Sequence, residues 1–189
     1  MKLNLRSLIL ILILLLCGTA LLGESFGERT ANQLREFGIS PWIIVLLISM
    51  LPIVELRGAI PVAIWVLGFD WPEAVLLSVA GNILPIPLVL LLLDWGIALV
   101  RRFKWGMRFT DWLFARTRNK GKVVERYEEL GLIVFVGIPL PGTGAWTGAL
   151  AAKIFGLSFW KSLLCAFLGV ILAAVLVTLI SVGIPAILG

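Results

Sequence analysis

The chain has 189 residues, of which 60% are hydrophobic and 14% are charged, and its mean hydropathy is +1.07. Soluble domains carry about 25% charged residues, so this composition excludes an ordinary soluble protein and predicts an all-α integral membrane protein. Histidine is absent, which excludes imidazole as a metal ligand or base. The net charge is +5, and the basic residues that produce it lie beside apolar segments, so we do not expect nucleic acid as a partner.

Residues 1–22 predict either a first transmembrane helix or a signal peptide. Lys2 and Arg6 precede an apolar run from Leu8 to Leu16, and small residues at 18–20 would serve as a cleavage site. Residues 23–40 are polar and predict an aqueous loop. We expect residues 23–189 to form a single transporter-like membrane domain.

Two charges stand out in the apolar sequence that follows. Glu55 and Arg57 are the only charged residues in the 29-residue run from Pro41 to Phe69. One charged side chain at the bilayer centre costs roughly 2.5–3.5 kcal/mol on insertion scales. Residues two apart point to different sides of a regular helix, so one continuous span could not easily pair or hide both.

The segments on either side of these charges are too short to cross a membrane. Residues 42–54 would make a helix about 20 Å long, and residues 60–69 are fewer, whereas the hydrocarbon core is about 30 Å thick. Pro52, Gly58 and Pro61 weaken helical hydrogen bonding around the charges. We therefore predict a re-entrant hairpin whose non-helical tip faces a polar cavity.

A full-length span is predicted next, over residues 74–100, interrupted at Gly81-Asn82 and by two prolines. Asn82 either lines the same cavity or forms a hydrogen bond between helices. Near the end of the span, we expect Asp94 to pair with Arg101 or Arg102.

Residues 101–129 carry nine Lys or Arg against four acids and predict a cytoplasmic amphipathic connector. Arg101, Lys104 and Arg108 share one helical face, and aromatic residues occupy another. Anionic lipid head groups near residues 101–122 are the predicted partners. The alternative is a topology signal without lipid preference.

The second tip follows the uncharged segment 132–140. Four of the eight residues 141–148 are proline or glycine, which cannot sustain a regular helix. The spacing of Gly144 and Gly148 also fits close helix packing. The last span is expected from Ser162 to about Ile187, and Cys17 and Cys165 are expected to face lipid or core without forming a disulfide.

A faint internal repeat relates residues 41–100 to residues 130–189. A shift of 88 residues places Gly81 on Gly169. With both hairpins re-entrant and a cytoplasmic amino terminus, 13 Lys or Arg lie inside and two outside, so the positive-inside rule favours this topology. We therefore predict a multi-pass cell-membrane protein built from two inverted repeats, each a re-entrant hairpin plus a transmembrane helix, behind an N-terminal helix.

The segments 55–61 (ELRGAIP), 81–82 (GN) and 139–149 (PLPGTGAWTGA) resemble the small multidrug export protein family, over roughly residues 40–185. More distantly, the layout is similar to that of DedA membrane proteins, whose re-entrant hairpins are associated with moving polyprenyl phosphate or other lipids between leaflets. An acid in the first hairpin of that superfamily matches Glu55. The second tip departs from it, since threonines and a tryptophan stand where arginines are typical.

Glu55 is the predicted carrier of a proton or cation, and Arg57 is its counter-ion or the anchor for an anionic group. The alternative is a buried ion pair that only fixes the hairpin. Hydroxyls, free amides and an indole of the second tip would contact substrate. The predicted substrate or coupling-ion site comprises both tips and the asparagine between them: Glu55, Arg57, Gly58, Pro61, Asn82, Pro139, Pro141, Gly142, Thr143, Gly144, Trp146 and Thr147.

The sequence therefore predicts a secondary transporter for a small amphipathic or lipid-like substrate, with proton coupling through Glu55. A DedA-type lipid translocase and a non-transporting membrane assembly factor are the alternatives. No nucleophile–base pair, nucleotide loop or metal cluster is visible, so we expect neither an enzyme nor a metal or cofactor. The sequence leaves a homo-oligomer open.

Overall fold

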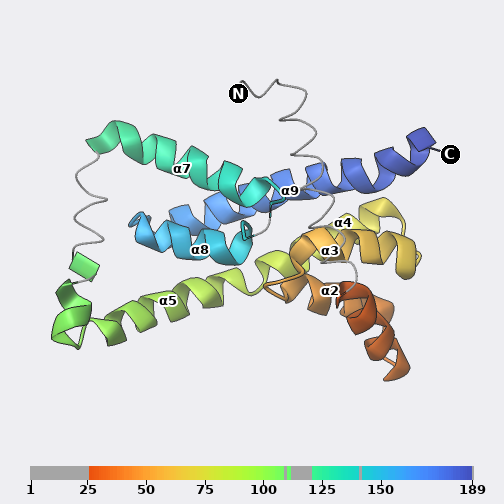
Figure 1. Ribbon diagram of the computed structural model, residues 1–189, viewed down its shortest axis with the longest axis horizontal. Coiled ribbons are helices and arrows are strands. Elements are labelled where there is room, and N and C mark those ends of the chain that lie inside the picture. Colours follow the sequence, from red (N-terminus) through yellow and green to blue (C-terminus); the bar gives the residue numbers. More distant parts are fainter. Residues whose placement is uncertain (1–25, 109, 112–120, 141, 189) are drawn as a thin grey trace, which may run out of the picture. The chain divides into compact units, whose positions relative to one another are not determined.

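The computed structural model describes residues 26–108, 110–111, 121–140 and 142–188, and the secondary structure within these ranges is helical (Figure 1). This confirms the predicted α class. The predicted N-terminal segment 1–22, part of the connector and Pro141 lie outside the described residues. The described residues form two compact units. Unit 1 contains those up to Asn82, those in 139–142 and those from Ala173 onward, and unit 2 contains the rest.

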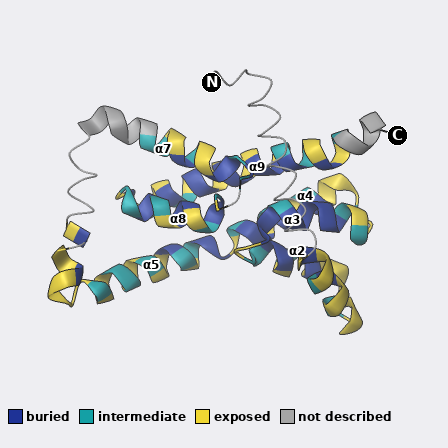
Figure 2. Ribbon diagram, viewed as in Figure 1, coloured by how far each residue is buried: buried dark blue, intermediate teal, exposed yellow. Residues whose placement is uncertain are grey.

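Two stretches in the described part of the chain are long and apolar enough to cross a membrane. Trp71–Val100 has 30 residues and a mean hydropathy of 2.3, and Phe159–Gly183 has 25 residues and a mean hydropathy of 3.0. Only 17% and 39% of their most apolar windows are buried within the molecule. Much of this apolar surface is exposed (Figure 2), as expected for helices that face lipid rather than a protein core.

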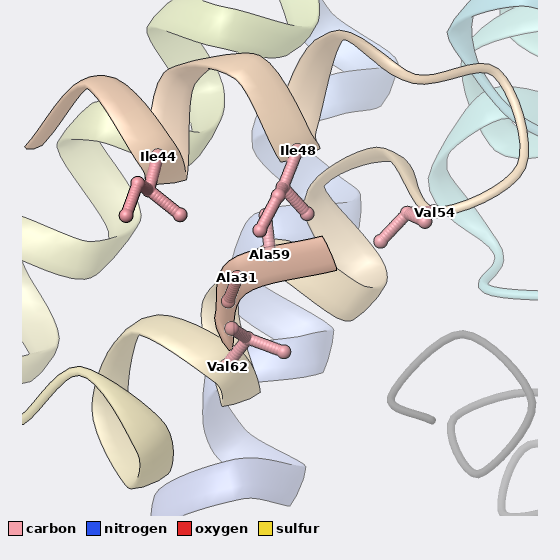
Figure 3. Close-up of a cluster of buried hydrophobic side chains, with 6 residues drawn as sticks. All are labelled: Ala31, Ile44, Ile48, Val54, Ala59 and Val62. Carbon is pink, nitrogen blue, oxygen red and sulfur yellow. The ribbon is translucent and has the colours of Figure 1, made fainter. Parts of the chain in front are cut away.

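Unit 1 begins with a helix over residues 26–36, where the sequence predicted an aqueous loop. That prediction was wrong because small residues on one face of the helix let it pack closely. Gly27 lies against Val62 and Val54, and Ala31 is completely buried. Figure 3 shows Ala31 inside the core cluster of this unit, whose members are Ala31, Ile44, Ile48, Val54, Ala59 and Val62.

Two short helices follow, α2 (Pro41–Met50) and α3 (Glu55–Pro61), and they pack against each other. The connecting residues 51–54 are not helical. A ten-residue helix is about 15 Å long, so neither helix alone can span a hydrocarbon core about 30 Å thick. The short apolar arm before the charges agrees with the prediction, but the predicted non-helical tip at Glu55–Gly58 was wrong. The non-helical residues are 51–54, and Glu55–Pro61 are helical because the Gly58 N–H still bonds to the Val54 carbonyl at 3.1 Å.

Pro61 ends α3, and a π-helix, η1 (Val62–Val66), continues from it. Proline has no backbone N–H, so the carbonyl four residues earlier loses its helical donor. The backbone hydrogen bonds after Pro61 then follow the wider π-helical pattern, in which each N–H bonds to the carbonyl five residues earlier. After a turn at Gly68, whose φ is +75°, α4 (Trp71–Ile83) begins. It packs through Ala74 and Leu77 onto Val45 of α2.

Unit 2 contains α5 (Ile86–Val100), α7 (Gly121–Gly137) and α8 (Ala145–Ile154), and α9 (Phe159–Leu188) runs through both units. The break between α4 and α5 falls at residues 84–85, where Pro85 caps α5. Helix α8 packs against α5 and α7. Residues 104–108 and 110–111 are helical and belong to the predicted connector, where Arg101 pairs with Asp111 at 2.9 Å.

An ion pair joins α5 to α8, and it shows that the predicted partner of Asp94 was wrong. Asp94, expected to pair with Arg101 or Arg102, instead accepts a hydrogen bond from Lys153 Nζ at 2.7 Å. The Lys153 side chain is 9% exposed and that of Asp94 is 51% exposed. The partner was missed because it lies 59 residues further along the chain, on a helix that only the tertiary fold brings alongside.

Glycines allow the closest helix contacts of unit 2. A Cβ added at Gly169 of α9 would lie 2.5 Å from Val136 Cβ and 3.0 Å from the Ile133 carbonyl oxygen, both on α7. A Cβ at Gly148 of α8 would lie 2.3 Å from the same valine. Gly148 is therefore a packing residue, as the glycine spacing predicted. Gly144, with φ +142°, lies in the turn before α8.

We expect Gly169→Ala to destabilise the protein. The added methyl meets Val136 and α7 backbone, and overpacking costs about 1–3 kcal/mol, which outweighs the gain of about 1 kcal/mol in helix propensity. The matched control is Gly183→Ala in the same helix, where nothing lies within 4 Å of the new methyl. That change should raise the free energy of unfolding by about 0.5–1 kcal/mol. Thermal unfolding of both purified variants would show equal midpoints if the contact were unimportant.

Candidate functional site

Glu55 lies at the start of α3, directly after the non-helical tip of the first hairpin. The residue as a whole is only 5% exposed. Its φ is +51°, and it is the only non-glycine residue with positive φ among the described residues. Such a conformation costs about 1–3 kcal/mol and persists only where the surrounding structure enforces it. The backbone thus holds the predicted carrier acid in a strained and buried position.

Arg57 lies two residues further along α3 and is half-buried. It interacts electrostatically with Glu55. Its Nη1 donates a hydrogen bond to the carbonyl oxygen of Leu140, within unit 1. The structure therefore brings Arg57 onto the backbone of the second tip, 83 residues away in sequence. Leu140 itself was not predicted, because a backbone carbonyl leaves no sequence signal.

Gly58 and Pro61, the other predicted residues of α3, are both buried. The Gly58 N–H donates to the Val54 carbonyl at 3.1 Å, which closes the first turn after the tip. Pro61 sets the transition to η1, as described above. Both residues shape the backbone around the charged pair and offer no side-chain chemistry of their own.

The second tip is divided between the two units. Pro139, which is buried, and Gly142 belong to unit 1, and Thr143–Leu172 belong to unit 2. Gly142 has φ +78°, a left-handed conformation that favours glycine. The predicted absence of regular helix over 141–148 holds for the described residues up to Gly144 but is wrong for 145–148, which form the first turn of α8, where the Gly148 N–H bonds to the Gly144 carbonyl at 2.7 Å.

The predicted polar contacts of the second tip are engaged locally. The Thr143 hydroxyl donates to the Ile138 carbonyl at 2.8 Å, and the Thr147 hydroxyl donates to the Gly144 carbonyl at 3.3 Å. Both hydroxyls therefore stabilise the turn that leads into α8. Trp146 is half-buried, and its indole Nε1 is buried without a hydrogen-bond acceptor among the described residues.

Asn82 lies on α4 at 1% exposure. Neither its Oδ1 nor its Nδ2 has a hydrogen-bond partner in the described structure, so the predicted interhelical hydrogen bond is not formed there. Two serines that sequence reasoning missed lie beside it. Ser78 is one turn earlier on the same face of α4, and Ser49 of α2 donates a hydrogen bond from Oγ to the Ser78 carbonyl. The only sequence signal was the four-residue spacing of Ser78 and Asn82.

Unit 1 therefore presents a buried carboxylate beside a half-buried guanidinium. Such a pair can bind and release a proton, or hold an anionic group on the arginine. No group of three His, Cys, Asp or Glu side chains that could hold a metal ion occurs in the described ranges.

A family model described as "Putative small multi-drug export protein" matches residues 55–176. The match begins at Glu55 and includes Arg57, α4 and the second tip, and it covers more than half of the chain. The comparison with curated proteins found no match. The comparison with solved structures found none either.

Proposed function

We propose that this chain, which belongs to the small multi-drug export family, is a secondary membrane transporter for small amphipathic or lipid-like substrates. Glu55 would carry the coupling proton, and Arg57 would be its counter-ion or the anchor for an anionic substrate group. The observation that carries the proposal is the placement of Glu55, 5% exposed and at positive φ, at the tip of two helices too short to span a bilayer.

The contact of Arg57 with the second tip supports a shared role for the two hairpins. A guanidinium attracted by Glu55 and bonded to the Leu140 carbonyl would respond to any change in the charge of Glu55. Protonation of the acid would weaken its attraction for Arg57 and free the guanidinium to rearrange. A proton-dependent switch of this kind is what a coupled transporter requires.

Flux measurements in purified proteoliposomes test the function. Ethidium and a fluorescent polyprenyl phosphate serve as an amphipathic and a lipid probe, with and without an imposed proton gradient. We expect gradient-dependent movement of one of the two, and the responding probe assigns the substrate class. A protein that moves neither probe under any gradient would favour the assembly-factor alternative instead.

We further propose that both hairpins are re-entrant and that the two repeats are inverted. Single cysteines at Arg35 and Trp71, both exposed in the structure, should react with an impermeant reagent from outside. A cysteine at Asn119, outside the described residues, should react only from inside. The background lacks Cys17 and Cys165. Cytoplasmic labelling at Arg35 together with external labelling at Trp71 would mean that the first hairpin crosses the membrane, against the proposal.

A further inference from the structure

Three polar side chains are buried where α4 packs on α2. Ser49 and Ser78 are completely buried, and Asn82 is 1% exposed. The contact is tight because Gly81 lies against the backbone of α2. A Cβ at Gly81 would be 2.6 Å from the Leu46 carbonyl oxygen.

Several polar atoms of this cluster lack a hydrogen-bond partner among the described residues. Ser78 Oγ and both amide atoms of Asn82 have no hydrogen-bond partner in the described part of the chain. An unmet buried polar group costs about 1–3 kcal/mol, so three such atoms on one helix face would be a considerable burden. Buried polar groups in folded proteins are normally satisfied by protein, water or a bound ligand.

Packing alone does not require these polar residues. Unit 2 contains the same contact, made by Gly169 against the carbonyl of Ile133 and the Cβ of Val136, just as Gly81 meets the carbonyl of Leu46 and the Cβ of Ser49. Aligning the two glycine contacts gives each polar residue a buried apolar counterpart: Val136 for Ser49, Ala166 for Ser78 and Val170 for Asn82. An equivalent helix contact is therefore built from apolar side chains alone.

We propose that Ser49, Ser78 and Asn82 form a binding site for a monovalent cation, Na⁺. The cluster is too enclosed for an organic substrate, and it offers hydroxyl and amide oxygens, which are hard ligands that suit an alkali cation. None of the three side chains is a carboxylate, which disfavours Mg²⁺ or Ca²⁺.

The position of the cluster adds to the argument. Ser49 lies in the last turn of α2, where the final carbonyls carry partial negative charge. The C-terminal ends of broken helices are where secondary transporters coordinate Na⁺. The proposed site shares no residue with the Glu55–Arg57 pair, and its test does not depend on the proposed transport function.

Cation-dependent stability of the purified full-length protein tests the site. Thermal unfolding is followed by tryptophan fluorescence in choline chloride and in equal concentrations of NaCl, LiCl and KCl. At about one hundred times its Kd, Na⁺ should raise the folding equilibrium constant about hundredfold and the thermal midpoint by about 5–10 °C. Radioactive Na⁺ bound by the same sample measures occupancy directly.

The decisive variant is Ser78→Ala with Asn82→Val, which installs the apolar counterparts from unit 2. It should be at least as stable as the native protein in choline, because it removes unfilled polar atoms, and it should lose both Na⁺ binding and the thermal shift. The control is Ser162→Ala in α9, a buried serine whose hydroxyl donates to the Ser158 carbonyl at 2.9 Å. That variant should keep the Na⁺ response.

Two outcomes would overturn the proposal. One is a native protein whose midpoint is the same in all four salts and which binds no radioactive Na⁺, since the cluster would then hold only water. The other is an Na⁺ response that survives the double substitution, which would place the cation elsewhere.

Discussion

Replacing Glu55 with glutamine is expected to abolish proton-gradient-driven flux while leaving the protein abundant in the membrane. Glutamine keeps the volume and most hydrogen bonds of the side chain, and it cannot ionise. Arg57 loses its negative neighbour in this variant, yet it keeps the Leu140 carbonyl as an acceptor. Flux in proteoliposomes and the amount of folded protein are measured together. The matched control is Glu73→Gln, which changes an exposed acid at the start of α4 and should leave flux intact.

A purely structural role for Glu55 makes a different prediction. Breaking a buried ion pair by removing one partner costs about 3–5 kcal/mol, so Glu55→Gln would then be poorly expressed. The double variant with Arg57→Gln separates the two roles. Recovered folding without flux fits a residue that both pairs and couples. Recovered folding with normal, pH-dependent flux would mean that neither residue is the coupling site, and the proposed mechanism would be wrong.

Replacing Asp94 with asparagine is expected to destabilise unit 2. Lys153 is 9% exposed at its side chain and would be left as a buried cation without its counter-charge. The loss should approach about 3 kcal/mol, the lower end of the range for buried pairs, because Asp94 is half-exposed. Adding Lys153→Met should restore most of the stability, since the methionine fills similar volume without a charge. Thermal unfolding in detergent measures both effects.

The Lys161–Glu129 pair provides the control for this experiment. Its Nζ and Oε1 are 2.8 Å apart, a similar distance, but the two side chains are 50% and 33% exposed. Glu129→Gln should cost no more than about 1 kcal/mol, as is typical of exposed pairs. Equal losses for Asp94→Asn and Glu129→Gln would show that burial of Lys153 does not determine the strength of its ion pair.

Much of the helical layout could be predicted from the sequence because it depends on local sequence features. The short helix before the charges and the break at Pro85 follow from prolines and from the lengths of apolar runs, although α2 ends at Met50 and the non-helical tip precedes Glu55 instead of containing it. The helix over residues 26–36 could not be predicted in this way. Its polar composition indicates a loop, whereas Gly27, Ala31 and Leu34 on one face of the helix pack against the rest of unit 1.

In the candidate site, the charged residues and Asn82 could be predicted from the sequence, but their polar neighbours could not. Glu55 and Arg57 are conspicuous because a charge in an apolar run is costly. Ser49 and Ser78 are not conspicuous, because single serines are tolerated in membrane helices and only the packing of α4 on α2 brings them to Asn82. The acceptor of Arg57 is a backbone carbonyl, and every residue has one, so only the tertiary structure identifies it.

The bond from Arg57 to the Leu140 carbonyl also has a consequence for biosynthesis. The acceptor is made 83 residues after the donor. At a translation rate of about 5–20 residues per second, an interval of about 4–17 s separates their synthesis. During that interval Arg57 cannot form its bond to Leu140. The order of synthesis therefore delays this link between α3 and the second tip until the second tip has left the ribosome.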